Sequence, residues 1–203
     1  QINMAESYWN DGIHERIAVF DLYFRKMPFN SGYAVFNGLK RVVNFIENFG
    51  FTNEDITYLK SIGYEEDFLN YLKDLKFTGN IKSMQEGEIC FGNEPLLRVE
   101  APLIQAQLIE TILLNIINFQ TLIATKASRI RQIATHDTLM EFGTRRAQEI
   151  DAALWGARAA FIGGFDSTSN VRAGKLFNIP VSGTHAHALV QTYGDEYIAF
   201  KKY

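Results

Sequence analysis

The sequence predicts an α/β protein in two parts, a mixed region of helices and strands followed by repeating strand–loop–helix units. Three stretches predict the repeating units: EFGTRRAQ at 141–148, GGFDSTSN at 163–170 and IPVSGTHAH at 179–187. Each closes a short apolar run with small or polar residues, and a helix-like segment follows. Such units place side chains at the C-terminal ends of parallel strands. We therefore expect an α+β domain over 1–135 and the first strand–helix units of a parallel sheet over 136–203.

Length and composition limit the class of protein. The chain has 203 residues, of which 47% are hydrophobic and 21% charged, as in ordinary globular domains. A formal charge of −3 gives no field that favours nucleic acid or an anionic membrane, so we expect neither partner. Polar residues interrupt the apolar runs, so no segment is expected to span a membrane. The single cysteine, Cys90, excludes an internal disulfide and fits a cytoplasmic location.

The first third of the chain predicts short alternating elements. They are the end of a helix over 1–9, a strand over 17–24, a turn over 28–32 and an amphipathic helix over 33–49. The strand contains Asp21 among apolar neighbours. We interpret Asp21 as an ion-pair partner of Arg16 or Arg25, with a role as a site carboxylate as the alternative.

The middle of the chain predicts more helix. Thr52 and Asp55 have the spacing of a capping box, so a helix should follow to about Ile62. The further expected elements are a helix over 64–75, a small β-meander over 80–100 and a long helix over 101–135. Basic residues near the end of that helix complement its dipole, with phosphate binding as the alternative: Lys126, Arg129 and Arg131.

The last third predicts three strands, each followed by a helix. The strands are expected at 139–142, 161–165 and 180–184. The first two are followed by helices, an alanine-rich one over 146–160 and a short one ending at Phe177 that Ser169 or Asn170 caps. A last helix is expected from His185 to about Tyr203. The three strands should be adjacent and parallel, with Arg145, Asn170 and Thr184 at one end.

The loops after these strands carry the candidate site. Arg145 and Arg146 offer planar guanidinium groups that bind carboxylate or phosphate, although an arginine pair is also a common structural feature. The hydroxyl and amide side chains over 167–170 precede a helix, an arrangement that binds anions but is also an ordinary cap. His185 and His187 have no further Cys or His ligands nearby, so acid–base or nucleophilic chemistry is favoured over a metal site. Together these groups suit an anionic, phosphate-bearing substrate.

These motifs resemble a known family. EFGTRRAQ (141–148), IGGFDSTSNVRAG (162–174) and IPVSGTHAH (179–187), with the opening stretch over 8–39, are similar to nicotinate phosphoribosyltransferase, a type II phosphoribosyltransferase. The resemblance implies an α/β-hammerhead-like first domain, followed by the first strands of an irregular TIM-like barrel. The family's N-terminal tyrosine and later barrel strands are absent. We therefore expect an N-terminal fragment that is inactive alone.

The resemblance also implies a reaction and a set of roles. Nicotinate and phosphoribosyl diphosphate give nicotinate mononucleotide and diphosphate, with ATP hydrolysis and with Mg²⁺ bound to the substrate, as the first step of NAD salvage. By similarity, Phe142 stacks on the pyridine ring, and Arg145 and Thr184 contact nicotinate. His187 is the histidine that ATP phosphorylates. Asn170 replaces an aspartate of the nicotinamide enzyme, and a neutral residue there favours the acid substrate. A homodimer is also implied.

Two other functions are compatible with the same sequence. The first is another phosphoribosyltransferase of this fold, acting on nicotinamide or quinolinate. The second is a binding or assembly module without catalytic activity, in which the long helix over 101–135 forms a subunit interface.

Overall fold

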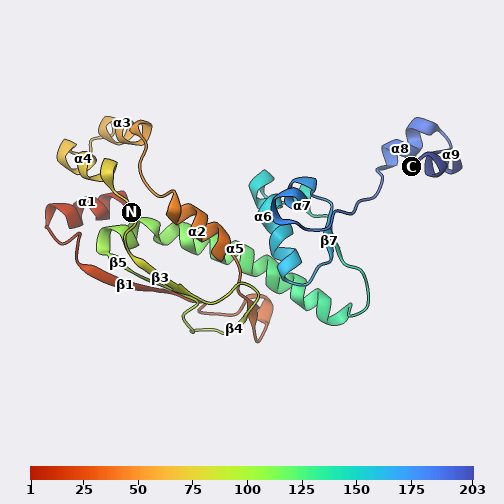
Figure 1. The fold of residues 1–203 in the computed structure, drawn as a ribbon, viewed down its shortest axis with the longest axis horizontal. Helices are drawn as coiled ribbons and strands as arrows, with labels where there is room; N and C mark the ends of the chain where they lie inside the picture. Colours follow the sequence, from red (N-terminus) through yellow and green to blue (C-terminus); the bar gives the residue numbers. More distant parts are fainter.

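One long helix, α5 (Leu103–Ile133), runs through the protein, and most of the other elements lie along it (Figure 1). The computed structural model describes residues 1–203. At 31 residues, α5 is far longer than the average globular helix of about 10–14 residues. Side chains are buried along it from Ile104 to Ala127, which explains how so long a helix is stabilised. The predicted long helix is confirmed, although residues 101 and 102 belong to a strand.

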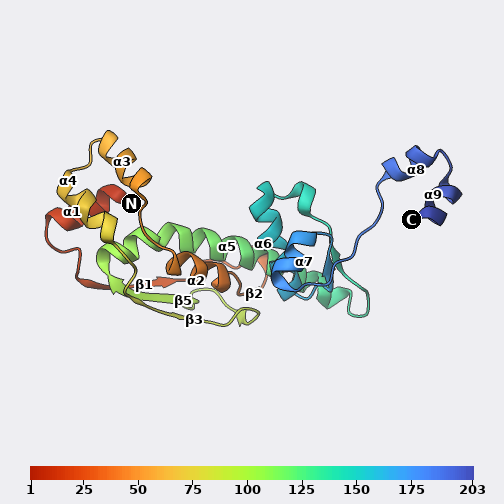
Figure 2. The ribbon, with the colours of Figure 1, turned by 45° about the horizontal axis from the view of Figure 1, so that its top comes forward.

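The other elements fall into three groups. The first group precedes α5 in the chain and consists of α1 (Ile2–Asn10), β1 (Ile17–Leu22), η1 (Pro28–Asn30), β2 (Ala34–Val35), α2 (Leu39–Glu47), α3 (Asn53–Ser61), α4 (Glu66–Asp74), β3 (Asn80–Ser83), β4 (Ile89–Cys90) and β5 (Leu97–Pro102). Beside its second part lie β6 (Met140–Glu141), η2 (Thr144–Arg146), α6 (Glu149–Ile162), β7 (Ser167–Thr168) and α7 (Val171–Phe177). Figure 2 shows the third group, α8 (His187–Tyr193) and α9 (Glu196–Lys202), set apart at the end of an extended segment.

An antiparallel sheet in the order β1-β5-β3 packs against α5. In the central strand β5, Leu97, Val99 and Ala101 are buried, whereas the alternate residues Arg98 and Glu100 are exposed. This alternation is the period of a strand with one buried face. Apolar burial between the sheet and α5 therefore forms part of the main core.

The expected partner of Asp21 is wrong. Its carboxylate accepts two hydrogen bonds from Arg98, from Nε at 2.7 Å and from Nη2 at 2.8 Å, and not from Arg16 or Arg25. The register places Asp21 directly opposite Arg98 on β5, which brings the two side chains together on the exposed face. This hydrogen bonding lowers the pKa of Asp21.

The expected helix over 33–49 begins later, at Leu39, because the residues before it are held extended. The backbone amide of Val35 donates to the Thr125 hydroxyl at 2.9 Å, and that of Asn37 donates to the Thr121 hydroxyl at 3.1 Å. β2 therefore uses side chains of α5 on one side and pairs with β4 on the other. The β-meander expected over 80–100 is only partly right. β3 pairs with β5, but β4, which lies between them in the chain, pairs with β2.

The capping box before α3 is confirmed. The amide of Asp55 donates to the Thr52 hydroxyl at 3.1 Å, and the amide of Thr52 donates to the Asp55 carboxylate at 2.7 Å. These reciprocal bonds satisfy two backbone donors that helix geometry leaves free. They also lower the pKa of Asp55, chiefly through the Thr52 hydroxyl.

The second expected strand of the last third, at 161–165, is wrong. Residues 161 and 162 complete α6, and the strand β7 begins at Ser167. The helix continues because its alanines pack directly on α5, and the chain turns only at Gly163 and Gly164, where φ of Gly164 is 105°. The expected single helix from His185 is also divided, since Gly194 with φ of 66° separates α8 from α9.

By length and composition α5 is apolar enough to cross a membrane, contrary to the expectation from the sequence. Half of its most apolar window is buried within the protein, and it contacts β1, β2, β5 and α6. The core helix of a globular protein meets the same criterion.

A largely buried ion pair joins α6 to the first part of the chain. Arg158 donates to both oxygens of Glu86, from Nη2 at 2.6 Å and from Nη1 at 3.0 Å. Glu86 also accepts from the backbone amides of Gly38 at 2.9 Å and Lys40 at 3.3 Å, at the start of α2. Burial alone raises the pKa of Glu86, but the Arg158 guanidinium and the two amides outweigh it and hold that pKa below its usual value. One carboxylate therefore fixes α2 and α6 together.

Replacing Arg158 with methionine should destabilise the protein, because it leaves the Glu86 carboxylate buried without its cation. Breaking a buried pair costs about 3–5 kcal/mol, so we expect the free energy of unfolding at pH 7 to fall by about 3 kcal/mol. Since the folded pKa of Glu86 is lowered, the stabilisation is present above the ordinary glutamate pKa and is lost as the pH falls through the lowered one. Urea unfolding at several pH values measures both effects.

Arg98→Met provides the matched control, because it removes a guanidinium from an exposed ion pair. Exposed pairs contribute little to stability, so this variant should unfold near the wild-type urea concentration. Equal losses in the two variants, or a loss in Arg158→Met that does not shrink in acid, would contradict the assigned role of Glu86.

Candidate functional site

Three segments of the last third run side by side and parallel. β6 pairs with β7 in the register Met140 to Ser167 and Glu141 to Thr168, and Thr168 forms a parallel bridge to Val181. The adjacency and direction predicted for these strands are confirmed, with the middle strand moved to 167–168. The loops that follow the three strands therefore leave from the same edge of the sheet.

Arg131, near the end of α5, fixes where the first two strands begin. Its guanidinium donates to four oxygens of two loops, those of Gly164 at 2.7 Å, Ala134 at 2.8 Å, Asp137 at 2.8 Å and the Asp166 carboxylate at 2.5 Å. Asp166 also accepts from the backbone amide of Leu139 at 2.7 Å. This backbone bond, followed by the guanidinium, lowers the pKa of Asp166. Arg131 therefore has the structural role at the helix end that we expected.

Asn170 links the second loop to the first. Its Oδ1 accepts from the Ala173 amide at 3.0 Å, so Asn170 rather than Ser169 caps α7. Its Nδ2 donates to the Thr144 hydroxyl at 3.4 Å, and Thr144 begins the turn η2 that carries Arg145. Phe142 is 41% exposed, and Arg145 is exposed and forms no ion pair within the protein. The structure thus brings the Phe142–Arg145 loop and Asn170 together, with an aromatic ring and a free guanidinium open to solvent.

Glu141 is a member of this cluster to which the sequence analysis gave no role. Its Oε2 accepts from the Thr168 hydroxyl at 2.7 Å, and its Oε1 accepts from the backbone amide of Gly143. The Thr168 hydroxyl in turn accepts from the backbone amide of Asn170 at 3.0 Å. The sequence feature that could have indicated this role is the position of Glu141 as the last residue of a strand, two residues before Gly143.

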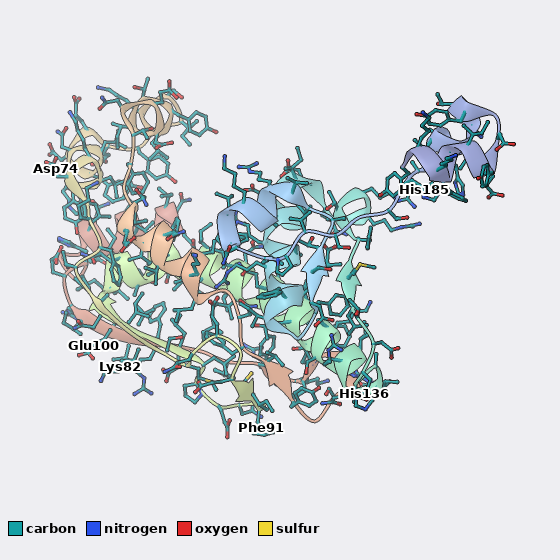
Figure 3. The ribbon with its side chains drawn as sticks, turned by 45° about the vertical axis from the view of Figure 1, so that its right-hand side comes forward. Asp74, Lys82, Phe91, Glu100, His136 and His185 are labelled. Carbon is teal, nitrogen blue, oxygen red and sulfur yellow. The ribbon has the colours of Figure 1, made fainter.

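Thr184 and His187 lie away from this cluster. Thr184 is exposed in the extended segment after Val181, and His187 is the exposed first residue of α8. No hydrogen bond or ion pair joins either residue to the first two loops. His185 instead packs on Phe200 and Tyr203, with ring centroids 5.0 and 5.7 Å apart, and Figure 3 shows it in the separate α8–α9 pair. The structure therefore brings together the candidate residues of the first two motif blocks, whereas the third block joins them only through its strand residues, at Pro180 to Ser182.

No three side chains of the His, Cys, Asp or Glu type are grouped closely enough to hold a metal ion. The groups that the site presents are an aromatic ring, a guanidinium and an amide. An aromatic ring and a guanidinium suit a flat, anionic ligand, because the ring stacks and the guanidinium forms paired bonds to an acid group.

Comparison with known proteins decides the family. Residues 1–118 match the nicotinate phosphoribosyltransferase (NAPRTase) N-terminal domain. The chain belongs to the nicotinate phosphoribosyltransferase family. Over 204 aligned residues it is 66% identical to the nicotinate phosphoribosyltransferase of Bacillus subtilis, and the alignment covers 100% of this chain.

Solved structures of related proteins have the same fold. The crystal structure of human nicotinic acid phosphoribosyltransferase matches 94% of this chain with a TM-score of 0.89 and 38% identity. Nicotinate-nucleotide pyrophosphorylase from Pyrococcus furiosus matches 98% of it with a TM-score of 0.80 and 26% identity. The α/β class predicted from the sequence is thereby confirmed. The chain spans 42% of the length of the Bacillus subtilis protein and 39% of the human chain.

Proposed function

We propose that the full-length protein carrying this chain is a nicotinate phosphoribosyltransferase. It joins nicotinate to phosphoribosyl diphosphate, with ATP hydrolysis, and gives nicotinate mononucleotide and diphosphate as the first step of NAD salvage. The observation that carries this proposal is the contact between Asn170 and Thr144 at 3.4 Å, which unites two motif blocks at the C-terminal ends of parallel strands. Membership of the family supports it independently.

The exposed groups of the cluster fit nicotinate. Phe142 would stack on the pyridine ring, and Arg145 would bind the nicotinate carboxylate or the neighbouring phosphate through charge-assisted bonds. The Oδ1 of Asn170 accepts from the backbone amide of Ala173, which leaves the neutral NH₂ group of the side chain facing the cluster. An aspartate would present a second, negatively charged oxygen at the same place. An aspartate would cap α7 equally well but would repel an acid substrate, which is why Asn170 favours nicotinate over nicotinamide.

Stabilisation of the leaving diphosphate and binding of its Mg²⁺ would involve parts of the protein beyond this chain. Loss of diphosphate leaves an oxocarbenium-like ribose, so catalysis requires the pyridine nitrogen to be held in line and the leaving anion to be stabilised. Mg²⁺ would arrive on the diphosphate oxygens of the substrate, which suits residues that offer no metal cluster of their own. Thr184, on the third loop, is the remaining residue proposed to contact nicotinate, and the extended segment after Val181 would have to bring it to the cluster.

His187 is the proposed phosphate acceptor from ATP. It is exposed, whereas the neighbouring His185 packs on two aromatic rings. Phosphorylation would add negative charge and acceptor oxygens at the start of α8. The resting environment of His185 favours a packing role, which supports the choice between the two histidines.

The wider organisation follows from the same family. We propose a first, α/β-hammerhead-like domain over 1–135 and the first units of an irregular TIM-like barrel over 136–203, with further barrel strands in the full-length protein. We also propose a cytoplasmic homodimer with sites near the interface between its subunits.

Turnover of three pyridines tests the proposed function. With phosphoribosyl diphosphate and ATP, the full-length protein should convert nicotinate far faster than nicotinamide or quinolinate, as measured by chromatography of the mononucleotide products. Preferred turnover of quinolinate or nicotinamide would assign a sister activity. Absence of turnover with all three, together with no heat of binding in calorimetry, would leave an assembly module.

Arg145→Lys tests recognition geometry, because lysine keeps the charge but loses the planar fork. Loss of a hydrogen bond to a charged group costs about 1.5–3 kcal/mol. The specificity constant for nicotinate should therefore fall by roughly 10- to 150-fold. Arg146→Lys is the adjacent control and should change it little. Wild-type efficiency of Arg145→Lys toward both nicotinate and phosphoribosyl diphosphate would rule out the assigned role.

His187→Ala should abolish stimulation by ATP and the acid-labile phosphate, while a slower ATP-independent turnover remains. Mass spectrometry of the intact protein at neutral pH, after incubation with ATP, detects the phosphate directly. His185→Ala serves as the comparison and should retain the phosphate. Phosphate that persists in His187→Ala and disappears in His185→Ala would exchange the two assignments.

A further inference from the structure

We infer that Glu141 is a positioning residue for the proposed nicotinate site: its carboxylate cross-links the loop that carries Arg145 to the strand that leads into Asn170. The inference rests on the proposed function, since the ligand of those two residues is taken to be nicotinate. It adds a residue for which neither the motifs nor the relatives supplied a role.

The contacts of Glu141 account for both of its carboxylate oxygens. Oε1 accepts from the Gly143 amide, within the 142–146 loop, and Oε2 accepts from the Thr168 hydroxyl at 2.7 Å on β7. Its backbone oxygen also accepts from the Ser169 amide at 2.9 Å. With both side-chain oxygens bonded to protein donors, Glu141 acts through these neighbours and not by contacting the substrate.

The cross-link continues to the residues that are proposed to bind nicotinate. The Thr168 side chain is fully buried. Its hydroxyl donates to Glu141 and accepts from the backbone amide of Asn170 at 3.0 Å. On the other side, Gly143 immediately precedes the η2 turn that contains Arg145. One carboxylate thus sets the separation of the two loops, and small displacements of such loops are costly in a binding site.

Gly143 is required by this arrangement for its small size and not for its backbone angle. Its φ of −81° is open to any residue, but a Cβ there would lie 2.7 Å from Oε1 of Glu141. Alanine at 143 would therefore fit the backbone and push the carboxylate away from its donors. The two positions should behave as one unit.

The test is a double-mutant cycle on the full-length protein. Glu141→Ala should raise KM for nicotinate roughly tenfold or more, the effect of losing a hydrogen bond to a charged group, while KM for phosphoribosyl diphosphate changes much less. Gly143→Ala should raise KM for nicotinate similarly. In the Glu141→Ala background, however, Gly143→Ala should add nothing, because the carboxylate that it displaces is already gone.

Two further variants separate positioning from folding. Glu141→Gln keeps an acceptor for the Gly143 amide, so it should recover most of the affinity for nicotinate that Glu141→Ala loses. Asp137→Ala is the control, since it removes a carboxylate that forms no hydrogen bond or ion pair, and KM should stay at the wild-type value. If Glu141→Ala fails to fold, Gly143→Ala and Glu141→Gln still test the inference.

The outcomes distinguish this inference from the proposed function. If the wild-type protein does not use nicotinate, the proposed function fails, and the inference fails with it. If the wild-type protein uses nicotinate but Glu141→Ala and Gly143→Ala keep its KM, or their effects simply add, the positioning role alone is wrong. A loss of stability without any change in KM would assign Glu141 to folding only.

Discussion

The Arg131 guanidinium lies where the long helix ends and the parallel strands begin, and the path of the chain from one to the other depends on it. It is a partly buried cation, so its donors need acceptors inside the protein, and four oxygens of two loops supply them. Because one of those acceptors, Asp166, also holds the Leu139 amide, the starts of β6 and β7 are tied to a single point. The placement of the site loops is thus set by a residue of the preceding helix.

Different side chains of α5 hold different neighbours, through hydrogen bonds at its threonines and through close packing at its alanines. Thr121 and Thr125 hold the backbone of β2 and its neighbours with their hydroxyl groups, as an adjacent strand would. Ala124 and Ala127 instead allow backbone contact with the end of α6, where a Cβ on Gly163 would lie 2.4 Å from the Ala124 carbonyl oxygen. Close packing at that point fixes the direction in which the chain leaves α6. The path of β7, and with it the position of Asn170, follows from small residues on α5.

Features that depend on a few neighbouring residues were predictable from the sequence, and those that depend on distant ones were not. The Thr52–Asp55 capping box and the cap of α7 are local, and both were expected, the second at Ser169 or Asn170. The partner of Asp21 is set by the register with a strand nearly eighty residues later, which no local pattern reveals. The apolar stretch at 161–165 has the composition of a strand, yet packing of the α6 alanines on α5 keeps its first two residues in a helix.

The same distinction applies to the site. Motif spacing was sufficient to select Arg145 and Asn170 as members of one cluster, because parallel strands deliver their loops to one edge. Glu141 was missed because its importance lies in the pairing of Glu141 with Thr168 across the sheet, and the middle strand was placed six residues too early. An error in register conceals cross-strand partners even where the strands themselves are correctly predicted to be neighbours.

The geometry also separates two tasks of the proposed reaction. Of the groups proposed to recognise nicotinate, Asn170 and the loop that carries Phe142 and Arg145 are cross-linked through Glu141 and Thr168, so their arrangement is preorganised within this part of the chain. His187 lies beyond an extended segment, in a helix pair that forms no hydrogen bond with that cluster. The proposed recognition of the pyridine and the proposed transfer of phosphate from ATP would therefore rest on different contacts. A substitution in one group is able to disable its own task while leaving the other intact, which is the physical basis for examining them with separate variants.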